Sequence, residues 1–177
     1  MNIAVVRNTG VPANCRKAQQ LADLFLKKAA RLGKCRWDEV SLVLNSDSGI
    51  RSVNRTFLNH DYPTDVISFS YRPVPGEVES ISGEIVVNVE LAIRLGKRFK
   101  GAERELALYI AHGCDHLAGA DDATGPQRRR MRARELRWVS DAAKKGLLEG
   151  LLKRKTAFSH HPKSHRPYPA FPGKPLP

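Results

Sequence analysis

Two histidines and a nearby carboxylate have the spacing of a metal site. His112 and His116 are four residues apart, so on a helix their side chains share one face, one turn apart. Gly119 follows and can end that helix, because glycine adopts the left-handed conformation at little cost. The chain can then turn back and bring Asp122 toward the two imidazoles. Three such ligands leave a coordination position open for water, as in catalytic zinc sites.

The spacing leaves the third ligand open. Asp121 is a rival to Asp122, because nothing in the pattern fixes the loop to one residue. The histidine and glycine spacings also agree with the long zinc-protease motif HExxHxxGxxH, in which a glutamate after the first histidine is the general base. Gly113 occupies that position here and can accept no proton. This argues against peptide hydrolysis and leaves a metal-bound hydroxide, or another nearby base, to attack the substrate.

Composition and charge narrow the class of protein. The chain has 177 residues, enough for one domain with a core, and its 30 lysines and arginines exceed its 18 aspartates and glutamates. This basic excess favours a polyanionic partner, either nucleic acid or an anionic membrane surface. We find neither a signal peptide nor the roughly 18 apolar residues of a membrane span, so we expect a cytoplasmic protein. The cysteines fit no disulfide or zinc-ribbon spacing and are predicted to be reduced, with Cys114 packed in the core: Cys15, Cys35 and Cys114.

Alternating strand and helix patterns must position these residues. Short runs rich in β-branched side chains predict four strands, at residues 2–7, 39–45, 66–71 and 83–89. Helical periodicity or capping residues mark five further segments, at residues 15–33, 46–59, 90–100, 102–119 and 124–154. Within the second of these, Ile50, Val53 and Phe57 share one face. The order predicts a single α/β (α+β) domain over residues 1–152, in which helices cover a small mixed sheet of about four strands, the third and fourth antiparallel.

The composition changes at the C-terminal end. Residues 153–177 contain six of the 11 prolines, three of the six histidines and six basic residues, but no acidic one. Such a segment has no apolar periodicity to bury, so we predict a flexible basic tail. We expect this tail to have no specific role, or to make weak electrostatic contact with phosphates.

Four segments of the chain occur together, in this order, in one known family. VNRTFLNHDYPTDVISF (53–69) is similar to a signature around a TDVLSF strand, and SGEIVVNV (82–89) to a GDIxIS strand. ELALYIAHGCDHLAGADD (105–122) is similar to the metal motif HGxLHLxGYDH, and MRARE (131–135) lies on the following helix. Over about residues 1–150 the chain therefore resembles the YbeY endoribonuclease family, also described as rRNA maturation factors.

The resemblance implies an activity, a metal and a partner. It implies a metal-dependent endoribonuclease specific for single strands, in which metal-bound water attacks the phosphodiester. The family's role is maturation of the 16S-type rRNA 3′ end and quality control of the ribosome, so the partners would be rRNA and the small ribosomal subunit. Its fold is a mixed sheet with helices around it. Its metal is usually taken to be zinc on three histidines; carried over, the ligands here are His112, His116 and, at the third position, Asp122.

Three positions depart from the family pattern. Asp122 replaces a histidine; two histidines and a carboxylate form a known catalytic zinc set, and the carboxylate also shifts preference toward harder ions such as Mn²⁺. Asp115 replaces an apolar residue before the second histidine, where we favour a structural or ligand-supporting role over that of a base. Leu58 replaces an arginine that many members carry and that would be a natural phosphate clamp.

Further residues are candidates for catalysis and RNA binding. Asp65 and Asp115 can orient the attacking water, and either can equally cap a turn or a helix. Three arginines point most nearly away from the buried side of the last helix and, beside a phosphodiester site, predict an RNA track: Arg129, Arg130 and Arg137.

Two other functions compete with RNA cleavage. One is a zincin-type metalloprotease, against which Gly113 argues. The other is a non-catalytic ribosome-binding factor that keeps the metal for structure, for which Leu58 is the best support.

Overall fold

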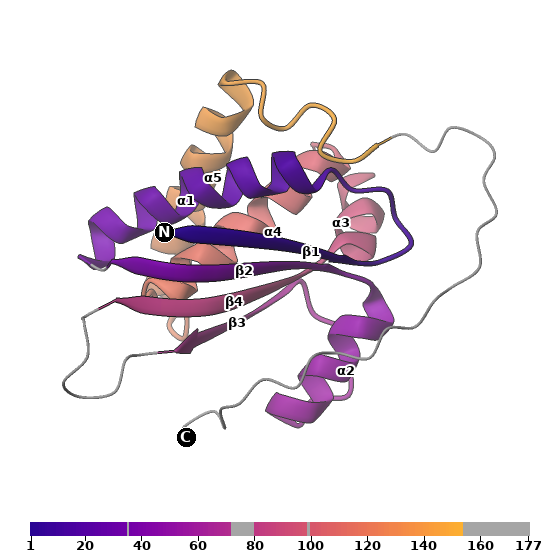
Figure 1. The fold of residues 1–177 in the computed structure, drawn as a ribbon, viewed down its shortest axis with the longest axis horizontal. Helices are drawn as coiled ribbons and strands as arrows, with labels where there is room; N and C mark the ends of the chain where they lie inside the picture. The colour runs from indigo at the N-terminus through magenta and orange to yellow at the C-terminus, as the bar shows by residue number, and fades with distance from the viewer. Residues whose placement is uncertain (35, 72–79, 99, 154–177) are drawn as a thin grey trace.

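The predicted strands form one mixed sheet in the order β1-β2-β4-β3. Their bounds are β1 (Asn2–Asn8), β2 (Trp37–Asn45), β3 (Val66–Tyr71) and β4 (Ile81–Asn88). β1, β2 and β4 are parallel, whereas β3 runs antiparallel to β4 at one edge (Figure 1), which confirms the predicted pair. The computed structural model describes residues 1–34, 36–71, 80–98 and 100–153.

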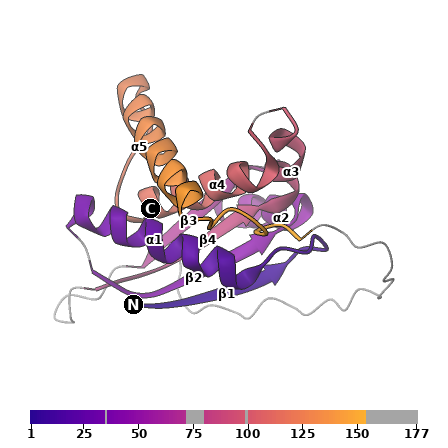
Figure 2. The ribbon, with the colours of Figure 1, turned by 90° about the horizontal axis from the view of Figure 1, so that it is seen from above.

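Helices cover both faces of this sheet, which confirms the predicted fold class. They are α1 (Cys15–Gly33), α2 (Asp47–Leu58), α3 (Val89–Gly96), α4 (Ala102–Leu117) and α5 (Gly125–Lys144). α1 and α4 lie on one face, and α5 extends from them away from the sheet (Figure 2). Fully buried side chains between this face and the helices include Phe25, Leu42, Ile85 and Ile110. Among the described helices, none combines the length and the apolar character needed to cross a membrane.

Two glycines let α4 lie unusually close to β3 and β4. A Cβ atom on Gly113 would stand 2.4 Å from Ile85 Cγ2, and one on Gly83 would stand 2.5 Å from Leu117 Cδ1. The hydroxyl of Ser68 donates to the carbonyl of Gly113 at 3.1 Å. This close approach fixes the C-terminal turns of α4 beside the edge strand β3.

α2 covers the other face of the sheet only in part (Figure 1). Ile50 and Val53 are buried there against Val86 and its neighbours. Phe57, which was expected to share their face, stays 48% exposed because it lies in the last turn of the helix, where its main aromatic contact is the edge of Phe69. The ring centroids of this pair are 5.3 Å apart.

The last helix is shorter than the sequence predicted. α5 begins at the expected cap, Thr124, which forms a capping box with Gln127, but the helix ends at Lys144 rather than at residue 154. Gly146 has a φ of +67°, and the backbone bonds around it form a Schellman-type cap, which stops the helix. The chain then returns to the loop before α1, where Leu152 pairs with Ala13.

The described cysteines carry free thiols, and Cys114 is fully buried in the core, as its predicted packing role required. Cys35 and the predicted basic tail, apart from Lys153, lie outside the described residues.

Candidate metal centre

The end of α4 brings the three predicted ligands together. His112 and His116 share one face of the helix, and their Nε2 atoms face each other at 3.1 Å. Gly119 adopts a φ of +90°, so the chain turns back after α4. Asp122 Oδ1 then lies 3.8 Å from His116 Nε2. One possible ligand atom from each of the three residues lies within 4.8 Å of the other two.

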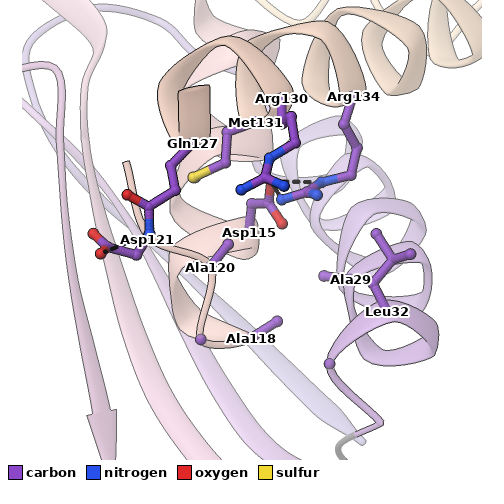
Figure 3. A pocket seen from close by; sticks show the side chains of 12 residues that line it. Ala29, Leu32, Asp115, Ala118, Ala120, Asp121, Gln127, Arg130, Met131 and Arg134 are labelled. Atoms are coloured by element: carbon purple, nitrogen blue, oxygen red, sulfur yellow. Dashed lines mark hydrogen bonds and ion pairs between the residues drawn. The ribbon is translucent and has the colours of Figure 1, made fainter. Parts of the chain in front are cut away.

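The side chain of the neighbouring Asp121 forms its hydrogen bonds elsewhere. Its Oδ1 accepts the backbone N–H of Ala123 at 3.1 Å, and its Oδ2 accepts Nε2 of Gln127 at 3.3 Å. Figure 3 shows the Asp121 carboxylate beside Gln127, at the start of α5. Of the two carboxylates that the sequence left open, the structure therefore brings Asp122 to the histidines.

Hydrogen bonds on the outer side of each ring leave both Nε2 atoms as acceptors. Nδ1 of His112 lies 2.7 Å from Oε1 of Glu135, and Nδ1 of His116 lies 2.9 Å from the carbonyl of Ala120. In neutral imidazoles with these partners both Nδ1 atoms donate, so two Nε2 lone pairs meet, which is unfavourable without a cation between them. Two nitrogens bound to one tetrahedral zinc at about 2.0–2.1 Å lie about 3.3 Å apart. The observed 3.1 Å is compatible with a zinc ion shared by the two nitrogens, as it is with a hydrogen bond donated by a protonated ring.

Glu135 is the site residue that the sequence reasoning missed. It belongs to α5, is 1% exposed and bonds His112 across 23 positions of sequence. A carboxylate behind a metal-binding histidine fixes the ring and raises its basicity. Burial lowers the pKa of His112, but the hydrogen bond and charge of Glu135, with the charges of Asp65 and Asp122, outweigh it and raise that pKa above its ordinary value. The available signal was an acidic residue on the buried side of α5.

Weakening this support should weaken metal binding. In Glu135→Gln the charge behind His112 is lost while size is kept, so we expect zinc affinity to fall by about 10- to 100-fold with the fold retained. Competition against a zinc-binding dye measures the change. Asp141→Asn is the matched control, because Asp141 is an α5 carboxylate that pairs with Lys28 away from the site. Equal zinc affinities for the two variants would show that Glu135 does not support the metal.

Asp115 faces away from the metal ligands. It is 2% exposed, and its Oδ2 accepts Nε of Arg134 at 2.9 Å and Nη2 of the same side chain at 2.5 Å. Figure 3 shows this pair beside Arg130 in a cavity of about 430 Å³ that α1 helps to line. Burial raises the pKa of the Asp115 carboxyl, against the opposing influence of Arg134. The pair joins α4 to α5, which suits the structural role expected for Asp115.

Two cavities open at the histidines. One, of about 280 Å³, is lined by residues that include Asp65, His112 and Asp122, and the other, of about 290 Å³, by residues that include both histidines and Ser68. Asp65 therefore faces the site, although its Oδ1 also accepts the hydroxyl of Thr64 and the N–H of Val66, each at 2.9 Å. The ligand side chains are 23–35% exposed, which leaves them accessible to a substrate.

The arginines nearest the site differ from those that the sequence singled out. Arg128 and Arg132 line the cavity that contains His112 and Asp122, and Nη2 of Arg128 donates to the Asp122 carbonyl at 3.2 Å. The three predicted track residues are all exposed on α5: Arg129, Arg130 and Arg137. Their role in RNA binding stays a prediction.

Fold and site together define a class of protein. It is a small α/β protein with a candidate divalent-metal centre of two imidazoles and one carboxylate, open to solvent and flanked by arginines. Such a ligand set is typical of metal-assisted hydrolysis.

The chain belongs to the YbeY endoribonuclease family. Residues 6–143 match the family described as Endoribonuclease YbeY, which confirms the resemblance drawn from four motifs and, at the level of the family, the expected enzyme class. A protein of that name from Rhodopirellula baltica is 40% identical over 120 residues, which are 66% of this chain and 60% of that protein. One from Elusimicrobium minutum is 39% identical over 136 residues, or 74% of this chain and 92% of that protein. A solution structure from Thermotoga maritima shares the fold, with a TM-score of 0.55 and 21% identity over 89% of this chain and 99% of that one.

Proposed function

We propose that this chain is a metal-dependent endoribonuclease that cuts single-stranded RNA in the cytoplasm. Its proposed role is maturation of the 16S-type rRNA 3′ end and ribosome quality control, with the small ribosomal subunit as partner. The observation that carries the proposal is the convergence of two acceptor Nε2 atoms, from His112 and His116, beside the Asp122 carboxylate. Family membership and the formal charge of +12 support RNA as the substrate.

The proposed ligands suit zinc. A zinc ion held by His112, His116 and Asp122 would lower the pKa of a bound water to about 7 and would polarise a phosphoryl oxygen. Glu135 and the Ala120 carbonyl hold the two rings in the tautomer that this binding requires. The carboxylate ligand also admits Mn²⁺.

Asp65 is the residue we assign to orient the attacking water. It lines the same cavity as His112 and Asp122. Its Oδ1 is engaged in the turn before β3, so Oδ2 is the oxygen proposed to receive the proton. Asp115 is less suited to this task, because its carboxylate is bound by Arg134 on another side of α4.

Arg128 and Arg132 are proposed to hold the phosphates beside the scissile bond. Both line the cavity at His112, and a guanidinium matches the geometry of a phosphate. The exposed arginines farther round α5 would extend this contact along the strand: Arg129, Arg130 and Arg137.

Reversing the charge of Arg128 and Arg132 together should weaken RNA binding without changing sequence preference. Each lost phosphate contact lowers the slope of log K against log salt by about 0.7 on single strands, so the pair should lower it by about 1.4. Titration of metal-free protein with a labelled single strand over a salt series measures this slope. Reversal of Arg16 and Arg31, which are exposed on α1, is the control. A double variant with the wild-type slope would remove both arginines from the RNA site.

The structure argues against one of the two competing functions and leaves the support for the other unchanged. A side chain at position 113 would meet Ile85, so the base of a zincin peptidase is excluded there by packing as well as absent from the sequence. A non-catalytic ribosome-binding factor keeps Leu58 as its support, since this 46% exposed side chain stands where many members carry an arginine.

One assay separates the three functions. Zinc-loaded protein is incubated with a structured RNA and with casein, each with and without a chelator. Chelator-sensitive RNA cuts support the proposed nuclease, casein cuts support the peptidase, and RNA binding without cuts supports the binding factor. The His112→Ala protein, purified in parallel, excludes a contaminating nuclease. RNA cuts that persist in this variant or in chelator would contradict the proposal.

A further inference from the structure

An aromatic groove adjoins the candidate metal centre across the edge strand β3. Its volume is about 350 Å³. The end of α2, the turn after it and β3 contribute its principal side chains: Asn54, Phe57, Leu58, His60, Tyr62 and Phe69. Val66 and Ser68 line both this groove and the cavity that contains His112 and His116. A single strand therefore separates the groove from the proposed ligands.

Large apolar side chains are exposed in this groove. Phe57 is 48% exposed, Leu58 46% and Tyr62 55%. Phe57 meets Phe69 edge-on, and the rings of His60 and Tyr62 are stacked with centroids 5.3 Å apart and planes 18° apart. Contiguous exposed apolar surface of this kind indicates a binding site.

The turn that carries the stacked pair is held in place. Asn54 is 2% exposed, and its Nδ2 donates to the carbonyl of Tyr62 at 2.8 Å. Its own carbonyl accepts the N–H of His60 at 3.2 Å, while Asn59 ends α2 with a φ of +58°. A turn whose backbone is held before binding loses little further entropy when a ligand arrives.

We propose that this groove binds an unpaired base of the RNA strand whose phosphodiester lies at the metal centre; the inference rests on the proposed nuclease function. Aromatic side chains stack on any base, because every base has a π-face. The two sides of β3 match the two parts of a nucleotide. Arg128 and Arg132 lie on the metal side, where phosphates are expected, and the aromatic rings lie on the other side of β3, where a base could stack. Leu58 adds uncharged apolar surface to the groove, which suits a base rather than a phosphate.

Single-strand specificity follows from this arrangement. In a duplex each base is already stacked and paired, so none can enter the groove without being unstacked. A flexible single strand can turn one base over β3 onto Tyr62 or Phe57 while its backbone stays near the arginines. The groove thus selects the strandedness of the substrate, and the metal centre selects the bond.

Binding to metal-free protein in chelator tests the groove separately from cleavage. We expect Tyr62→Ala and Phe57→Ala each to weaken the binding of a labelled single-stranded oligoribonucleotide by about 5- to 100-fold and to leave duplex binding unchanged. Tyr71→Ala is the matched control, because Tyr71 is 42% exposed at the other end of β3, outside the groove. Its binding should equal that of the wild type.

Tyr62→Trp gives a direct signal and guards against misfolding of the alanine variants. Tryptophan keeps the stacking surface, so affinity should be retained, and its emission should be quenched by the single strand but not by a duplex. The natural tryptophans, Trp37 and Trp138, are only 8% and 6% exposed and should give a steady background.

Several results would overturn the inference. Unchanged binding in Tyr62→Ala and Phe57→Ala, or an unquenched Tyr62→Trp, would remove the base from the groove. A change in sedimentation of Tyr62→Ala, with RNA binding intact, would assign the groove to a second copy of this chain instead. Cleavage that continues with no dependence on the groove would leave the nuclease proposal standing alone. Groove-dependent binding without metal-dependent cleavage would support the base-binding groove and contradict the proposed nuclease function.

Discussion

Replacing Asp122 with alanine is expected to remove the bound metal and to lower RNA cleavage by more than about 100-fold. The variant keeps His112 and His116, but two ligands hold a divalent ion far less tightly than three. Loss of a residue that only supports a ligand lowers metal affinity or activity by about 10- to 100-fold, and loss of a ligand itself should exceed that range. Elemental analysis of protein purified without a histidine tag, and chelator-sensitive cleavage by the same preparation, measure the two effects.

The adjacent carboxylate supplies the control for this experiment. Asp121 lies one position earlier and bonds Ala123 and Gln127 rather than approaching the histidines. Asp121→Ala should therefore keep a full complement of metal and near-normal cleavage, with a loss of about 1 kcal/mol or less in the free energy of unfolding from the lost capping bonds. If Asp122→Ala retained metal and activity while Asp121→Ala lost them, the two aspartates would have to exchange roles.

Replacing Gly113 with alanine should destabilise the fold by about 2 kcal/mol. Overpacking costs about 1–3 kcal/mol, and a Cβ 2.4 Å from Ile85 Cγ2, between a helix and a sheet that cannot easily separate, belongs at or above the top of that range. Alanine is the better helix former by about 1 kcal/mol, which offsets only part of this loss. Urea unfolding monitored by circular dichroism gives the difference in free energy between the variant and the wild type.

The sign of this effect is informative. Were α4 not pressed against the sheet, Gly113→Ala would stabilise the protein through helix propensity alone. Gly125→Ala is the control, since a Cβ there meets only the flexible guanidinium of Arg129 at 3.4 Å, and its effect should stay within about 0.5 kcal/mol. Gly113→Glu, which rebuilds the zincin motif, is expected to unfold the protein rather than to yield a peptidase. Greater stability of Gly113→Ala would disprove the close approach.

Local sequence determined the elements and the first part of the site. The strand pattern predicted the four strands, because β-branched side chains gather in short runs of neighbouring residues where the backbone is extended. The pairing of β3 with β4 followed from their short connection. His112 and His116 could be placed together because four residues on a helix always return to one face. The motifs around them identified the family.

Only the tertiary structure decided which residues support the ligands. Glu135 lies 23 positions after His112, and their bond depends on how α5 packs on α4. Asp115 reaches Arg134 through the same packing. Periodicity placed Glu135 on the buried side of its helix, but it carries no information about which neighbouring helix a buried carboxylate meets.

Contacts between helices, strands and turns also determined the third ligand and the exposure of Phe57. Asp121 and Asp122 are equivalent by spacing, and the turn at Gly119 together with the start of α5 chose between them. Phe57 fits the apolar face of α2, yet it lies in the last turn of the helix, where it meets the edge strand at Phe69 and stays largely exposed. A sequence specifies local geometry directly, because the backbone repeats every few residues. The meeting of distant side chains depends on the packing of whole helices against the sheet, which no short pattern encodes.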